Sequence, residues 1–213
     1  MINDLVEYLQ YESPPKKHNI ILNDIYKSPI IDTEHMKKIA DLLFTNQNKM
    51  INSYSLLNIG IGYNLAPNWQ NLFRDVFQYT KIANIEVWMP YIHYWQYQNK
   101  FPVWYADVRS INTILPEKSV DTVLWAQGPE HVEQHEILSI YNEMKKIARH
   151  SIMFVTPWGK YYDYQEEWNN NPFEKHITKN MDVDSYLGTN LQTLTVSTKD
   201  QPDAAMFAYE FLT

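Results

Sequence analysis

From residue 54 onwards, short apolar runs of strand length alternate with longer stretches of helical character. This alternation is typical of repeated βαβ units, in which parallel strands form one sheet and crossover helices cover both of its faces. The sequence therefore predicts an α/β fold. The expected parallel strands are residues 55–59, 81–87, 103–107, 120–125 and 151–156, and the expected crossover helices are residues 67–79, 90–98 and 131–150.

The two ends of the chain depart from this alternation. Residues 191–197 and 205–212 are strand-like runs whose polar link is too short for a helix, so we expect an antiparallel pair at the edge of the sheet. At the other end, prolines at 14 and 15 follow a short helical stretch. We expect residues 1–30 to be an appendage, residues 31–213 to be the main domain, and the aromatic-rich residues 156–190 to be a lid inserted into it.

The composition restricts the class of ligand. The chain has 213 residues, a formal net charge of -7, 16 Tyr, 7 Trp and no Cys. The acidic balance argues against a nucleic-acid surface, and the absence of Cys excludes disulfides, thiolate metal sites and a Cys nucleophile. No run reaches ~18 consecutive apolar residues, and the start of the chain lacks a signal-peptide pattern. We expect a cytoplasmic protein with a small ligand and no contact with a membrane.

A glycine turn follows the first predicted strand, at Gly60 and Gly62. Ligands of open parallel sheets bind beyond the carboxyl ends of the strands, and a turn without Cβ atoms lets the backbone approach them. Glu86 ends the second strand about two dozen residues later, where nucleotide-binding domains place an acceptor for ribose hydroxyls. A tight structural turn and a solvated carboxylate are the alternatives. Val87 follows Glu86 and is a candidate wall for an adenine ring.

Polar residues also follow the third and fourth predicted strands. Asp107 is suited to accept from an adenine amine while the N–H of Val108 meets a ring nitrogen, although an N-cap is the alternative. Residues 125–131 form a polar turn that leads into a helix and is expected to face the transferable group. In this turn, Glu130 and His131 are candidates for a general base, the alternatives being a helix-dipole contact and a structural histidine.

Together, these residues resemble the class I S-adenosylmethionine-dependent methyltransferases from about residue 56 to the C-terminus. The family motif acid-x-Gly-x-Gly-x-Gly stands here as Asn58-Ile59-Gly60-Ile61-Gly62-Tyr63-Asn64. Residues 156–159 and 171–176 look like the strand-five turn and lid of an uncharacterised branch found in bacteria and their phages. The cofactor-binding residues that the resemblance implies are Asn58, Gly60, Gly62, Asn64, Glu86, Val87, Asp107, Val108, Trp125 and Gln127.

The resemblance also implies the arrangement of the sheet and the catalytic pair. The expected fold is a three-layer sandwich with a mostly parallel seven-stranded sheet in the order 3-2-1-4-5-7-6, whose last strand is antiparallel. Glu130 and His131 correspond to the family's Glu-His pair after strand four. Asn58 replaces the usual acid and Asn64 the third glycine, so the methionine ammonium loses a charge-assisted contact.

Three other functions were weighed. A nicotinamide-dependent oxidoreductase needs glycine at position 65, which is Leu65. A metal enzyme needs clustered ligands, but His131 and His135 do not form the His-Glu-x-x-His order, so we predict no metal site. A catalytically degenerate binding or scaffolding protein stays open because of Asn58. The sequence favours S-adenosylmethionine-dependent methyl transfer to an oxygen or nitrogen of a small, unidentified acceptor.

Overall fold

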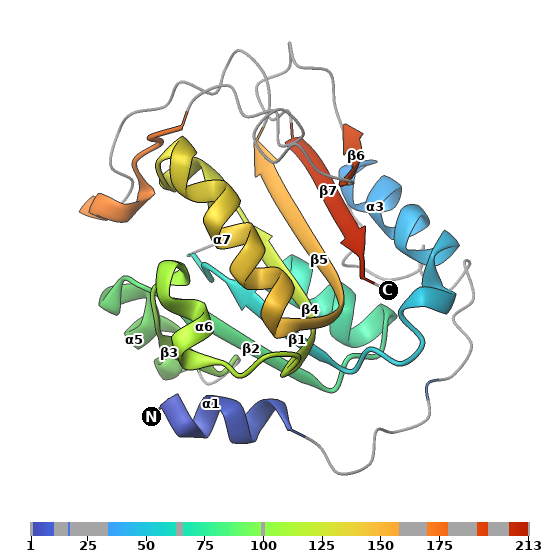
Figure 1. The fold of residues 1–213 in the computed structure, drawn as a ribbon, viewed down its shortest axis with the longest axis horizontal. Coiled ribbons are helices and arrows are strands. Elements are labelled where there is room, and N and C mark those ends of the chain that lie inside the picture. Colours follow the sequence, from blue (N-terminus) through green and yellow to red (C-terminus); the bar gives the residue numbers. More distant parts are fainter. Residues whose placement is uncertain are drawn as a thin grey trace.

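A seven-stranded sheet forms the centre of the computed structural model, which describes residues 2–10, 17, 34–62, 66–98, 101–157, 170–178, 191–195 and 205–212 (Figure 1). The strand order is β3-β2-β1-β4-β5-β7-β6, as the sequence predicted. The strands are β1 (Ser55–Ile59), β2 (Lys81–Glu86), β3 (Val103–Tyr105), β4 (Val120–Ala126), β5 (Ala148–Pro157), β6 (Gln192–Thr195) and β7 (Ala205–Phe211).

The first five strands are parallel, and β7 runs antiparallel to both β5 and β6. The strand order reverses at β1, which pairs with β2 on one side and β4 on the other. A reversal of this kind opens a crevice beyond the carboxyl ends of the strands. Every residue of β1 and β4 is buried, because both faces of the sheet are covered.

Helices cover the two faces and create a core on each side. Leu57 and Ile59 of β1 face the core that includes residues of α1 and α7, whereas Leu56 faces the core that includes residues of α3 and α4. The alternation follows from the pleat of the strand, whose successive side chains point to opposite faces. The helices are α1 (Ile2–Leu9), α3 (Glu34–Thr45), α4 (Ala66–Asn71), α5 (Met89–Gln98), α6 (Ile111–Ile114) and α7 (Gln134–Ile147).

The predicted helix over residues 131–150 is wrong at both ends. Residues Pro129–His131 form a short 3-10 helix, and α7 begins only at Gln134, where the Glu136 carboxylate accepts from the N–H of Glu133 at 3.0 Å. At the other end, β5 already starts at Ala148. The next residue, Arg149, links β5 to β4, because its Nε donates to the Asp121 Oδ1 at 2.6 Å. The predicted helix over residues 67–79 is also shorter, since α4 passes into a π-helical turn, Leu72–Val76.

The N-terminal helix α1 contributes to the core of the main domain. Leu5 and Leu9 are fully buried in the core that also holds Leu57. The Tyr8 hydroxyl donates to the carbonyl of Ile82 in β2 at 3.3 Å, and its ring packs on Trp104. The residues predicted as an appendage therefore include a helix that packs on the sheet, although the boundary at residue 30 falls outside the described residues.

The described part of the predicted lid is residues 170–178, with a short 3-10 helix at Pro172–Glu174. The remainder up to residue 190, apart from Thr156 and Pro157 at the end of β5, lies outside the described residues. Across the described ranges, no helix combines the length and the apolar character needed to cross a membrane.

Candidate functional site

The glycine turn lies directly beyond the carboxyl end of β1. Gly60 and Gly62 have φ values of +73° and +57°, in the left-handed region that residues with a Cβ rarely adopt. The N–H of Gly60 donates to the carbonyl of Ile85 at 2.9 Å, which fixes the turn against β2. Among the described residues, no heavy atom lies within 4 Å of a Cβ added to Gly62, so they leave space beside the backbone there. Asn64 lies outside the described residues.

Glu86 lies beside this turn, at the end of β2. Its Oε2 accepts from the N–H of Gly62 at 3.3 Å, and its Oε1 accepts from the N–H groups of Val87 and Trp88 at 2.8 and 3.0 Å. The residue is only 7% exposed, and this burial raises the pKa of the carboxyl although the backbone N–H groups oppose the shift. The structure thus brings together Glu86, its neighbour Val87 and the glycine turn.

Asn58 takes part in a buried polar network between β1, β2 and α4. Its Nδ2 donates to the Oδ1 of Asn84 at 3.0 Å, and Gln70 Nε2 donates to the same oxygen at 2.7 Å. The Asn58 Oδ1 has no hydrogen-bond partner among the described residues. Asn84 and Gln70 were missed in the sequence, although a polar residue inside the apolar run 81–87 was the available signal.

Asp107 follows β3 and caps a 3-10 helix, Val108–Ser110. Its Oδ1 accepts from the N–H of Arg109 at 2.9 Å, and the Arg109 guanidinium lies 3.3 Å from its Oδ2. The same guanidinium binds Glu136 of α7 at 2.8 Å. The Asp107 side chain stays 37% exposed, so the cap and the ion pair leave the carboxylate accessible, whereas Val108 is buried.

The turn after β4 is tightly built. Gln127 has a φ of +54°, an unusual conformation for a residue with a Cβ, and its N–H donates to the carbonyl of Val155 at 2.7 Å. A Cβ on the next residue, Gly128, lies 1.8 Å from the Trp125 Nε1, so only glycine fits. The indole of Trp125 is itself buried in the core beside Phe154. The buried indole of Trp125 therefore restricts position 128 of this turn to glycine.

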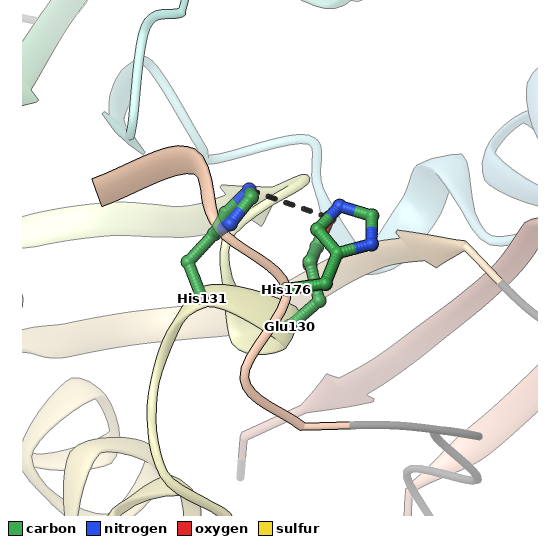
Figure 2. A group of neighbouring side chains, drawn as sticks. All are labelled: Glu130, His131 and His176. Carbon is green, nitrogen blue, oxygen red and sulfur yellow. Dashed lines mark ion pairs between the residues drawn. The ribbon is translucent and has the colours of Figure 1, made fainter. Parts of the chain in front are cut away.

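Glu130 and His131 follow in the 3-10 helix, and His176 from the lid segment lies against them (Figure 2). Complete burial raises the pKa of the Glu130 carboxyl to about 8. Burial and the neighbouring His176 lower the pKa of His131 to about 4, against the carbonyls of Lys175 and Gln127, which raise it. Near neutral pH the imidazole of His131 is therefore neutral and the carboxyl of Glu130 is largely protonated.

Residues 170–178 contact both the α5 side of the site, near Glu86, and the turn after β4. Glu174 accepts a hydrogen bond from the Tyr91 side chain of α5, and the charge of Glu86 adds to the burial that raises the pKa of Glu174. Further along, the N–H groups of Ile177 and Thr178 donate to the carbonyl of Glu130 at 2.9 and 3.2 Å. Residues 170–178, called the lid segment after the sequence prediction, thus reach from the neighbourhood of Glu86 to the turn after β4.

Comparison with known proteins identifies the fold. No protein-family model matches the sequence, and no curated protein matches it significantly. A methyltransferase from Archaeoglobus fulgidus, described as SAM dependent, superposes with a TM-score of 0.56 at 12% identity, covering 89% of this chain and 99% of that one. Magnesium protoporphyrin IX methyltransferase from Synechocystis PCC 6803 with bound SAM gives 0.54 at 12%, covering 99% and 91%.

A third solved structure, geranyl diphosphate methyltransferase in complex with SAM, gives a TM-score of 0.54 at 10% identity and covers 95% of this chain and 93% of that one. The matches extend over nearly the whole of both chains in all three cases. This chain therefore has the fold of the class I S-adenosylmethionine-dependent methyltransferases, with the strand order that the sequence predicted.

Proposed function

We propose that the protein binds S-adenosylmethionine beyond the carboxyl ends of β1 to β4 and transfers its methyl group to an oxygen or nitrogen of a small acceptor. The observation that carries the proposal is the position of Glu86. Its carboxylate lies 3.3 Å from the N–H of Gly62, inside a glycine turn at the point where the strand order reverses. A ribose diol needs an acceptor at such a position.

The adenosine half of the cofactor fits the residues present. The Glu86 carboxylate would accept from the ribose hydroxyls, and its longest backbone bond, to Gly62, is the one that a hydroxyl replaces most readily. The open space beside Gly62 gives the ligand access to the backbone. Asp107 keeps an accessible carboxylate for the adenine amine, and Val87 and Val108 directly follow Glu86 and Asp107 in the sequence.

The methionine half fits less well, because the Asn58 amide is turned into the polar network with Asn84. Among the described residues, the backbone of the glycine turn and the turn at Gln127 are the candidate contacts for the methionine half. Since charge-assisted hydrogen bonds are roughly twice as strong as neutral ones, we expect weaker binding than an acidic residue at position 58 gives in the same fold.

The chain contributes mainly by positioning. S-adenosylmethionine, when bound, supplies an electrophilic methyl group on a sulfonium centre. The strands and turns of this chain would hold the two reactants for in-line displacement, and such alignment can contribute ~7–11 kcal/mol. A dedicated base is therefore not required, which agrees with the low basicity of His131 and the burial of Glu130.

A small acceptor agrees with the charge of the chain. The net charge of -7 disfavours a phosphate-rich polymer, and the lid is rich in aromatic side chains that suit a partly apolar molecule. Two of the similar structures are named for magnesium protoporphyrin IX and geranyl diphosphate, neither of which is a nucleic acid.

A binding or scaffolding role without catalysis is the second candidate. The observation that favours it is the Asn58 network, which removes the charged contact to the methionine ammonium. In that case the fold persists and the cofactor does not bind.

Calorimetry distinguishes these two functions. The purified protein is titrated with S-adenosylmethionine, S-adenosylhomocysteine and NAD, together with Glu86→Ala and Asp107→Ala variants. We expect binding of the first two ligands only, with at least tenfold weaker affinity in both variants. Glu117→Ala is the control, because this exposed carboxylate precedes β4 at the opposite end of the sheet. No binding of any ligand supports the scaffolding role.

A further inference from the structure

Three side chains with metal-binding atoms meet beside the turn after β4. One carboxylate oxygen of Glu130 and one ring nitrogen each of His131 and His176 lie within 4.8 Å of one another (Figure 2). His176 comes from the lid segment, far along the chain from the other two. The backbone aligns the two segments, because Ile177 and Thr178 donate to the carbonyl of Glu130 and the Thr178 Oγ1 donates to the carbonyl of Val132 at 2.5 Å.

Glu130 is the residue in this cluster that needs a partner. It is 0% exposed, and neither carboxyl oxygen has a hydrogen-bond partner among the described residues. The Nε2 of His131 lies 3.9 Å from Oε1, which is too far for a hydrogen bond. Buried carboxyl groups without hydrogen bonds are rare in folded proteins, and buried charged ones pair with a cation or coordinate a metal. A metal ion that binds Glu130 would therefore displace the proton that the buried carboxyl carries near neutral pH.

The ring of His131 is oriented as a ligand. Its Nδ1 lies 3.2 Å from the carbonyl of Lys175, an acceptor, so the Nδ1 carries the proton. The lone pair then resides on Nε2, which is the nitrogen that faces Glu130. A backbone carbonyl that binds the second ring nitrogen is the usual support of a metal-binding histidine.

We propose that Glu130, His131 and His176 bind a divalent first-row transition-metal ion, with Zn²⁺ as the ion of choice. Two imidazoles and one carboxylate suit such an ion, whereas Mg²⁺ and Ca²⁺ prefer oxygen ligands throughout. Ligand atoms about 2.0–2.2 Å from zinc are about 3.4 Å apart, so the cluster contracts by roughly an ångström when the ion binds. Three protein ligands leave a coordination position for water or another oxygen.

The bound ion tethers the lid segment to the turn after β4 through His176. None of the three ligands belongs to the glycine turn or to Glu86, so metal binding does not depend on the proposed methyl transfer. The proposed metal site differs from the sequence prediction, which considered His131 together with His135 and predicted no metal site. His135 is exposed on α7 and is absent from the cluster.

The test uses the full chain without a polyhistidine tag, freed of metal with a chelator. Zn²⁺ is titrated by calorimetry and Co²⁺ by visible absorption, both without S-adenosylmethionine. We expect one ion per chain and d–d bands of a four- or five-coordinate Co²⁺ site. Affinity falls at least tenfold in His176→Ala and in Glu130→Gln, and stays unchanged in the control His135→Ala.

Circular dichroism checks the fold of each variant. If Glu130→Gln does not fold, His176→Ala decides, because the half-buried ring of His176 lies in the lid segment outside the core. The proposal is overturned if neither ion binds, or if binding in His176→Ala equals that of the unmodified chain. A titration with S-adenosylhomocysteine in the same samples separates this result from a failure of the proposed cofactor site.

Discussion

Two residues near the ends of neighbouring strands, Glu86 and Asn58, differ in how they can contribute to the proposed cofactor site. Glu86 is buried at the glycine turn with its carboxylate bound to backbone N–H groups. Asn58, on the adjacent strand, donates to Asn84 and is closed off from solvent. Glu86 thus places an ionisable group beside the glycine turn at a cost in stability. Asn58 is instead fully buried. The binding site is therefore expected to depend on Glu86 far more than on Asn58.

The charge of Glu86 makes stability depend on pH. Burial raises the pKa of this carboxyl above its unfolded value, so its contribution to stability is present at low pH and is lost as pH rises through the folded pKa. The neighbouring Glu174 shifts in the same direction. We expect the Tm of Glu86→Gln minus the Tm of the unmodified protein to increase from pH 5 to pH 8, measured by scanning calorimetry without ligand. A constant or shrinking difference contradicts this explanation.

Asn58→Asp tests the network. The carboxylate cannot donate to the Asn84 Oδ1, which already accepts from Gln70, and it places a charge at a fully buried position. We expect a loss of roughly 1–3 kcal/mol in the free energy of unfolding at pH 7, measured in urea.

Acid should partly restore the Asn58→Asp variant, because the protonated carboxyl is again a donor. Asn58→Ala is the control, since it loses the hydrogen bond without burying a charge and should show no such pH dependence. If Asn58→Asp instead retains full stability and binds S-adenosylmethionine more tightly, the side chain reaches the ligand and the network is dispensable.

At the scale of elements, the turns after β1 and β4 are built by different means. The turn after β1 uses two left-handed glycines, and a Cβ on the second, Gly62, would meet no described atom within 4 Å. The turn after β4 is held against the core, because the backbone of Gly128 lies on the buried indole of Trp125. The lid segment then binds to the second turn through the carbonyl of Glu130. The turn after β4 is thus held by buried contacts, and in the proposed site the turn after β1 is the one that a ligand approaches.

A double-mutant cycle with Gly128→Ala tests whether the Trp125 indole restricts position 128. The Cβ of the alanine overlaps the indole, and we expect the variant to lose roughly 1–3 kcal/mol in urea unfolding. The same change in a Trp125→Leu background should cost clearly less, with a coupling of about 1 kcal/mol or more. Additive losses indicate that Trp125 does not restrict position 128.

At the scale of the whole molecule, the strands followed from local patterns, whereas the strand order followed from the family resemblance. Buried parallel strands are apolar runs, so the order of elements and the terminal antiparallel pair were readable. Contacts between segments that are distant in the sequence could not be predicted in this way. Nothing local shows that His176 meets Glu130 from an irregular segment, or that Leu9 enters the core. The Asn58 network likewise depends on the register of β1 with β2, which pairs Asn58 with Asn84.

The central claim is that the crevice beyond β1 to β4 binds S-adenosylmethionine through Glu86 and the glycine turn. Nuclear magnetic resonance of the ¹⁵N-labelled chain with added S-adenosylhomocysteine tests it most directly. We expect saturable shifts of the backbone amides of Gly60, Gly62, Val87 and Trp88, and we expect these shifts to be lost in Glu86→Ala. Unchanged amides at these positions at millimolar ligand, or equal shifts in Glu86→Ala, would contradict the claim.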